Sequence, residues 1–117
     1  MKTLLSFFVV FFALTGNYAI ADDNREIEFL LSFVAGSDCI FIRNGKEYQG
    51  NEASEHLARK YDYAKGRIRS AENFINKIAS KSSMTRKPYL VRCSGKEMLA
   101  GEWFSEALAL YRENGVK

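Results

Sequence analysis

The sequence predicts an α+β domain in which two β-hairpins form a small antiparallel sheet that packs against about four helices, with one disulfide. Two observations support this prediction. A short β-branched run, a two-residue turn and a helical stretch follow one another twice along the chain, and apolar residues elsewhere recur at helical spacing. About 100 residues are enough for a single domain with a modest core.

The first 21 residues are predicted to be a signal peptide. Lys2 gives a positive start, residues 4–14 form an 11-residue apolar run, and Ala19-Ile20-Ala21 has the small-x-small pattern of a signal-peptidase site. The run is shorter than the roughly 20 apolar residues that a membrane span needs. We therefore expect cleavage after Ala21 and a periplasmic, single-domain protein of residues 22–117 that does not span the membrane.

The chain contains two cysteines, Cys39 and Cys93. Thiols in exported proteins are usually oxidised, so we expect a disulfide that closes a separation of 54 residues. The alternative is two buried free thiols. Two cysteines and one histidine do not supply a tetrahedral ligand set, so no metal site is predicted. No cofactor is predicted either.

Residues 22–36 are predicted to form the first helix. Apolar residues follow the i, i+3, i+4, i+7 pattern, namely Ile27, Leu30, Leu31 and Val34. Acidic residues at its start suit the positive end of the helix dipole, and Gly36 suits a C-terminal cap.

Residues 39–49 are predicted to form the first hairpin. Asn44-Gly45 is a strong hairpin signal because a type I′ turn needs positive φ at both central residues. Asn51 is the predicted cap of the next helix. A bend is expected between residues 66 and 70, with Ser70 as a new cap.

The second half repeats this order. Residues 71–79 carry a helical apolar stripe, residues 80–87 are polar and loop-like, and Pro88 disfavours helix at the residue before it. Residues 89–99 form the second predicted hairpin, which turns at Ser94-Gly95, and residues 102–114 form the closing helix.

The two hairpins share a short sequence. Gly-Lys-Glu occurs at residues 45–47 and again at 95–97, and a further glutamate lies five residues after each trio, at Glu52 and Glu102. One explanation is a duplicated unit. The other is that the same turn and first-turn chemistry recurs wherever a hairpin leads into a helix.

His56 is the one histidine of the chain. A general base needs an orienting carboxylate and a nearby nucleophile; Glu52 lies one helical turn away, but no nucleophile is apparent. The chain lacks the nucleophile elbow, the zinc-protease motif, the phosphate loop, the dinucleotide fingerprint and the calcium loop. The sequence therefore favours a non-enzymatic protein; a small hydrolase or transferase with His56 as base is the alternative.

Charge is distributed in blocks. Residues 22–58 have a net charge of −5, residues 59–96 carry 11 basic and 2 acidic residues, and residues 97–117 have a net charge of −2. This predicts a basic face for an anionic envelope component, such as a lipid head group, a lipopolysaccharide phosphate or an acidic protein. Export and the acidic remainder disfavour nucleic acid. Alternatively, folding places the acidic first helix against the basic middle segment and neutralises it.

The favoured function is a binding or accessory module for an envelope component. The predicted binding residues are Arg43, His56, Arg86, Lys87, Tyr89 and Arg92. A Cys39–Cys93 bond would bring the two hairpins together, and with them Arg43 and Arg92. An inhibitor of an envelope enzyme is a third hypothesis, since small size and a disulfide suit one.

Several segments, taken in order, resemble one protein family. They are residues 41–45 (FIRNG), 56–57 (HL), 71–75 (AENFI), 80–83 (SKSS) and 87–89 (KPY). These residues resemble the YfeK-like family of small exported bacterial proteins (domain of unknown function 5329), over roughly residues 37–111. The resemblance implies a periplasmic location, and it supplies no catalytic residues to transfer. The family pattern has Gly before Lys-Pro-Tyr, where this chain has Arg86.

Overall fold

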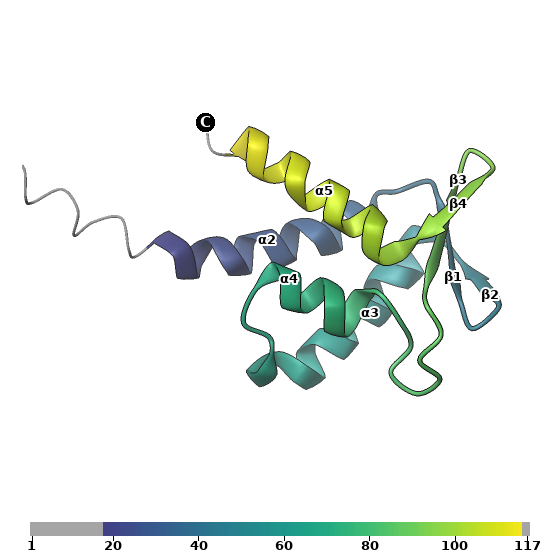
Figure 1. Ribbon diagram of the computed structural model, residues 1–117, viewed down its shortest axis with the longest axis horizontal. Helices are drawn as coiled ribbons and strands as arrows, with labels where there is room; N and C mark the ends of the chain where they lie inside the picture. Colours follow the sequence, from purple (N-terminus) through teal and green to yellow (C-terminus); the bar gives the residue numbers. More distant parts are fainter. Residues whose placement is uncertain (1–17, 116–117) are drawn as a thin grey trace, which may run out of the picture.

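The structure is a computed structural model that describes residues 18–115, with side chains from residue 24 to residue 114. It confirms the α+β class (Figure 1). The elements in chain order are α2 (Tyr18–Ala35), β1 (Ile40–Arg43), β2 (Lys46–Tyr48), α3 (Gly50–Ala64), the 3₁₀ turn η2 (Lys65–Arg67), α4 (Ala71–Phe74), the π-helical turn η3 (Ile75–Ala79), β3 (Leu90–Cys93), β4 (Lys96–Leu99) and α5 (Ala100–Gly115). Most of the predicted signal peptide, residues 1–17, lies outside the described part.

The four strands form one antiparallel sheet in the order β2-β1-β3-β4, with β1 and β3 at its centre. Phe41 pairs with Tyr48 on one side and with Val91 on the other. Side chains alternate between the faces of a strand, so Phe41 and Val91 point into the core while Ile40 and Arg92 point out. Figure 1 shows the helices gathered on one side of the sheet. The sheet therefore has one packed face and one open face.

The predicted disulfide between Cys39 and Cys93 is confirmed. These residues lie next to the paired residues Ile40 and Arg92, and their Cα atoms are 4.6 Å apart. That spacing matches the roughly 4.5 Å of a non-hydrogen-bonded antiparallel pair. The bond therefore joins the two hairpins at the end of their shared central pairing.

The first hairpin turn has the predicted positive φ values, and the second predicted turn has nearly the same geometry. Asn44 and Gly45 have φ values of 51° and 80°, and Ser94 and Gly95 have values of 51° and 81°. The similarity between the halves extends further, because each position from 40 to 50 has the same degree of burial as its counterpart from 90 to 100. Both units therefore use the turn, the strand faces and the helix start in the same way.

The helix starts are set by local hydrogen bonds. Ser70 caps α4 as predicted, since its hydroxyl accepts from the backbone N–H of Asn73 at 3.0 Å. The predicted cap Asn51 is wrong: α3 begins at Gly50, and Gln49 is its N-cap. The backbone N–H of Gln49 donates to the carboxylate of Glu52 at 3.0 Å, and this contact selects the earlier start.

The core lies between the helices and the inner face of the sheet. Its buried members from α2 are Ile27, Leu30 and Val34, three of the four residues of the predicted stripe. Polar contacts also link the helices: the guanidinium of Arg112 in α5 donates hydrogen bonds to the carboxylates of Glu26 and Glu72. These bonds connect α5 with both α2 and α4.

The disulfide generates a prediction about stability. Replacing Cys39 and Cys93 together by serine should lower the free energy of unfolding by up to about 4 kcal/mol, since the bond restricts a long loop of the unfolded chain. Urea denaturation of the variant and the oxidised wild type measures the difference. Equal unfolding midpoints for the two proteins would contradict the predicted stabilisation.

Gly50 generates a second prediction. A Cβ atom there would lie 2.8 Å from the carbonyl oxygen of Ser37 and closer still to that of Val34, since α3 starts against the end of α2. Gly50→Ala should destabilise the fold by about 1–3 kcal/mol. Gly66→Ala is the control, because an added Cβ there meets no atom within 4 Å. Equal thermal midpoints for the two variants would contradict the close packing of α2 and α3.

Candidate functional site

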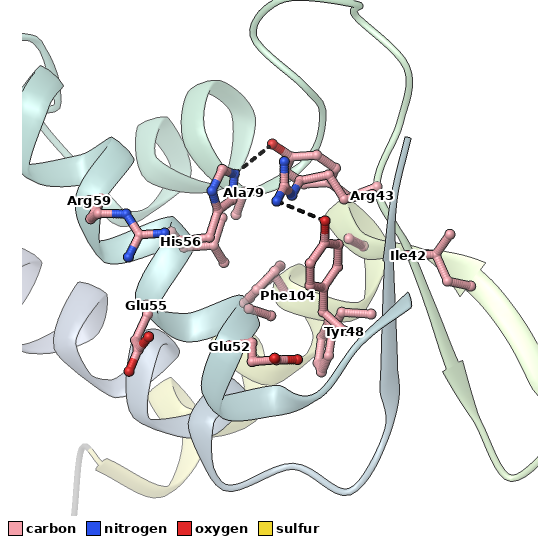
Figure 2. A pocket seen from close by; sticks show the side chains of 14 residues that line it. Ile42, Arg43, Tyr48, Glu52, Glu55, His56, Arg59, Ala79 and Phe104 are labelled. Carbon is pink, nitrogen blue, oxygen red and sulfur yellow. Dashed lines mark hydrogen bonds between the residues drawn. The ribbon is translucent and has the colours of Figure 1, made fainter. Parts of the chain in front are cut away.

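A cavity of about 170 Å³ lies where the first hairpin, α3 and α5 meet (Figure 2). Its buried lining is mostly apolar and consists of Phe41, Leu57, Ala79, Tyr89, Ala100 and Phe104, of which Tyr89 carries a hydroxyl group. More exposed side chains form its rim, namely Arg43, Tyr48, Glu52, Glu55, His56 and Arg59. The cavity therefore combines an apolar interior with a charged opening.

A larger groove of about 560 Å³ lies beside it, between α3 and η3. Four basic residues line this groove, namely Arg59, Lys60, Arg67 and Lys77, and no aspartate or glutamate of the described chain does. We call it the cationic groove. His56 and Arg59 line both spaces, so the groove and the cavity are neighbours that share one wall.

The hydroxyl of Tyr89 lies at the centre of a hydrogen-bond chain between the two spaces. The ammonium group of Lys60 donates to this oxygen at 3.1 Å, and the oxygen lies 3.3 Å from Nε2 of His56. Lys60 also donates to the carbonyl oxygens of Ile78 and Lys81, at 2.8 and 3.1 Å. All three donors of the ammonium group are therefore satisfied, and every acceptor is uncharged.

The surroundings shift the pKa values of these groups. Burial, followed by the charges of Arg43, Lys60 and Arg59, lowers the pKa of His56 to about 4. Burial, followed by the charge of Arg43, lowers the pKa of Lys60 to about 8, and burial raises the pKa of Tyr89. At neutral pH His56 is therefore neutral, and the Tyr89 hydroxyl accepts from Lys60 and is hydrogen-bonded to Nε2 of the imidazole.

Arg43 is held by a second tyrosine. Its guanidinium donates to the hydroxyl of Tyr48 at 3.0 Å and lies 4.7 Å from the centre of that ring, a contact that Figure 2 shows. Within residues 24–114, no carboxylate lies within 4.0 Å of the charged groups of Arg43, Arg59 or Lys60. The positive charge of the site is therefore not neutralised by ion pairs.

The pairing of β1 with β3 brings this site together. Arg43 ends β1 and lies on the same face as Phe41, while Tyr89 precedes β3 and lies on the same face as Val91. His56 and Lys60 lie one turn apart on α3, which faces them. Three of the predicted binding residues, Arg43, His56 and Tyr89, thus meet at one place.

Arg92 does not join them. It lies on the open face of the sheet, where it contacts the carboxylates of Glu47 at 3.0 Å and Glu97 at 3.9 Å. The expected cluster of Arg43 and Arg92 is therefore wrong. The strands are neighbours as predicted, but the pleat directs the two side chains to opposite faces.

Arg86 and Lys87 are exposed and line neither the cavity nor the cationic groove. Arg86 has a φ of 66°, a left-handed conformation that glycine adopts without steric cost. This explains in physical terms why a glycine suits the position before Lys-Pro-Tyr. The two residues belong to the loop 80–88, which leads into Tyr89 and β3.

The loop 80–88 is fastened to the first turn by Asn44. The hydroxyl of Thr85 donates to the side-chain oxygen of Asn44 at 2.7 Å, and the Asn44 amide donates to Ser82 at 3.5 Å. The backbone N–H groups of Met84 and Thr85 donate to the buried Ser82 hydroxyl. The loop in turn presents the carbonyl of Lys81 to Lys60. Asn44 therefore supports the site in addition to forming the turn.

The basic segment 59–96 is only partly neutralised. In the part of the chain with described side chains, two of its basic residues have carboxylate partners, Lys65 with Asp62 and Arg92 with two glutamates. The acidic residue Glu26 of α2 pairs with Arg112 instead. Neutralisation by the first helix, the alternative to a basic face, therefore does not occur at the groove.

Several site residues were absent from the predicted set, namely Tyr48, Arg59, Lys60, Arg67 and Lys77. For two of these residues, Lys60 and Arg67, the sequence does contain a pattern that could have found them. His56, Lys60, Tyr63 and Arg67 recur at i, i+4, i+7 and i+11, the spacing of one helix face, although α3 ends at Ala64 and Arg67 lies in the following turn η2. No such signal marks Lys77, which reaches the groove from η3.

The enzyme hypothesis requires a carboxylate that orients His56. Glu52 lines the cavity, but its carboxylate accepts from the backbone of Gln49, and the side-chain partner of His56 is Tyr89. Over the described residues, no three acidic, histidine or cysteine side chains are grouped as metal ligands would be. Over the same residues, every helix is too short or too polar to cross a membrane.

Lys60 generates a prediction. Lys60→Met keeps the length of the side chain but leaves the carbonyls of Ile78 and Lys81 without this donor, which should lower the free energy of unfolding by about 1–3 kcal/mol. Lys65→Met is the matched control, since its pair with Asp62 is exposed and should matter by less than about 1 kcal/mol. Urea denaturation measures both. An effect at position 60 no larger than that at position 65 would contradict the structural role of Lys60.

The comparisons with known proteins confirm the resemblance. The model of the "Family of unknown function (DUF5329)" matches residues 21–112. The "Uncharacterized protein YfeK" of Salmonella typhimurium strain LT2 is 41% identical over 70 residues, which cover 59% of this chain and 58% of that protein. The match thus spans less than two thirds of that relative's length. No solved structure matches the chain. On the extent of the family match, the chain belongs to the family of unknown function DUF5329.

Proposed function

We propose that the protein is a periplasmic, non-enzymatic binding module that holds an anionic group of an envelope component in the cationic groove. One observation carries the proposal: four basic side chains line a groove of about 560 Å³, and no carboxylate of the described chain lines it with them. Clefts lined by one sign of charge concentrate ligands of the opposite sign.

The residues of the groove suit phosphate and carboxylate groups. Arg59 and Arg67 present guanidinium groups, which bind such anions through two parallel hydrogen bonds, and Lys60 and Lys77 act as point charges. The apolar residues Ile68 and Ile78 also line the groove. Arg59, Arg67 and Lys77 are exposed, so their attraction for an anion acts through solvent and depends on the salt concentration.

The periplasmic location is part of the proposal. The pattern of residues 1–21 supports it, as does the Cys39–Cys93 bond, since disulfides persist in oxidising compartments. An inhibitor of an envelope enzyme and an enzyme that uses His56 are the competing functions. A binding module is favoured over the enzyme because His56 is hydrogen-bonded to a tyrosine and has no bonded carboxylate in the described chain.

The proposal predicts binding of a simple polyanion. Inorganic pyrophosphate should bind the wild type, and the double variant Arg67→Ala/Lys77→Ala should bind it at least about tenfold more weakly, since two of four charges are lost. Isothermal titration calorimetry at low ionic strength measures both affinities. Binding should also weaken as salt is added.

The control is the double variant Lys46→Ala/Lys96→Ala. It removes the same net charge from the two hairpins, at exposed positions that line neither the cavity nor the groove. Its affinity should match that of the wild type. Equal losses in the two double variants would point to attraction by net charge alone, and absence of binding to the wild type would also overturn the proposal.

A further inference from the structure

The cationic groove and the apolar cavity share a wall, and this arrangement specifies the ligand more closely. We propose that the ligand is an amphiphilic phosphate monoester: its phosphate lies in the cationic groove, and a short apolar group, about the size of one aromatic ring, enters the adjoining cavity. The inference rests on the proposed function, because it assigns the ligand class of the same site.

The size of the cavity limits the apolar group. Its volume is about 170 Å³. An apolar protein cavity of about 150 Å³ is known to hold benzene, so one ring or a short branched chain fits here and a long acyl chain does not. Phe41, Leu57 and Phe104 in the buried lining have no side-chain hydrogen-bonding group, and the hydroxyl of Tyr89, which is also buried there, is engaged by Lys60 and His56. Such a surface favours an apolar occupant over bound water.

The rim of the cavity sets the orientation of the ligand. Glu52 and Glu55 line the cavity, whereas no carboxylate of the described residues lines the groove. Figure 2 shows both glutamates lying apart from the guanidinium of Arg43. Arg43 and Arg59 line the cavity as well, so the formal charges of its rim cancel, whereas the groove has four cations and no carboxylate among its lining residues. The anionic end of the ligand is therefore attracted more strongly to the groove, and the uncharged end is directed inward.

The cavity and the groove adjoin at a shared pair of residues. His56 and Arg59 line both spaces. His56 is kept in place by its contact with the hydroxyl of Tyr89, which Lys60 holds from the groove side. A ligand that spans the two spaces would pass His56 and Arg59, and its phosphate would lie beside cations that have no bonded carboxylate in the described chain.

The number of cations favours phosphate over carboxylate. Four basic side chains line the groove, and a phosphate monoester carries up to two negative charges and three acceptor oxygens at neutral pH. A single carboxylate would leave most of this positive charge uncompensated. Phosphate therefore suits the groove better than any singly charged anion.

The test compares inorganic phosphate, phenyl phosphate, hexyl phosphate and octyl phosphate by isothermal titration calorimetry on the full mature chain. Phenyl phosphate should bind about tenfold more tightly than inorganic phosphate, since its ring is removed from water. Octyl phosphate should bind no more tightly than hexyl phosphate, because the cavity is already full. Continued tightening with chain length would instead indicate a lipid tail on an open surface, and it would overturn the ring-sized cavity as the binding site.

A cavity-filling variant locates the apolar part. Ala53 lines the cavity on α3, where it is partly exposed and borders the core, so the larger side chain of Ala53→Leu should occupy the cavity. It should abolish the advantage of phenyl phosphate and leave the affinity for inorganic phosphate unchanged. Ala53→Met provides the same test with a more adaptable side chain if the leucine variant folds poorly by circular dichroism.

The outcomes separate this inference from the proposed function. Binding of inorganic phosphate with no gain for phenyl phosphate would overturn the amphiphilic ligand and leave the anion site standing. A gain that persists in a folded Ala53→Leu or Ala53→Met protein would also overturn the inference, because the ring would then lie elsewhere. Absence of binding by all four anions would overturn both.

Discussion

The antiparallel pairing of β1 with β3, closed at one end by the Cys39–Cys93 bond, is the contact on which the rest of the structure depends. Each hairpin alone has two short strands, and isolated hairpins are marginally stable in water. Their union gives a four-stranded sheet with one face on which the helices pack. It also brings Arg43, from the first half of the chain, close to Tyr89, from the second.

The site that results carries unneutralised positive charge, and this has a consequence for stability. The pKa of Lys60 in the folded protein is about 8, below its ordinary 10.5, so the folded state binds fewer protons than the unfolded state between these pH values. The contribution of Lys60 to stability therefore rises as the pH rises through that window. At neutral pH the charged form is retained at a cost in free energy, which a bound anion would offset.

The same reasoning applies to His56 in acid. Its pKa is about 4 in the folded protein and ordinarily 6.5, so the unfolded state binds more protons between these values. The contribution of His56 to stability is therefore lost as the pH falls from about 6.5 to 4. Both groups are less stable in their charged forms for the same reasons: partial burial and the proximity of Arg43.

The turns and the cap at Ser70 could be predicted from the sequence, whereas the inward face of β3 and the packing of η3 on α3 could not. The turns at Asn44-Gly45 and Ser94-Gly95 and the cap at Ser70 each depend on a few neighbouring residues. The placement of Arg92 depends on which face of β3 points inward, and the short strand alone does not reveal it. Lys77 joins the groove only because η3 packs on α3, a contact that no local pattern encodes.

The most direct test of this site is the titration of His56 by nuclear magnetic resonance. The chain has one histidine, so its imidazole signals are unambiguous. If Arg43, Lys60 and Tyr89 surround the ring as described, the imidazole should titrate near pH 4 and be neutral at pH 6. An imidazole that titrates near its ordinary 6.5 would contradict the assembly of the site from the two halves of the chain.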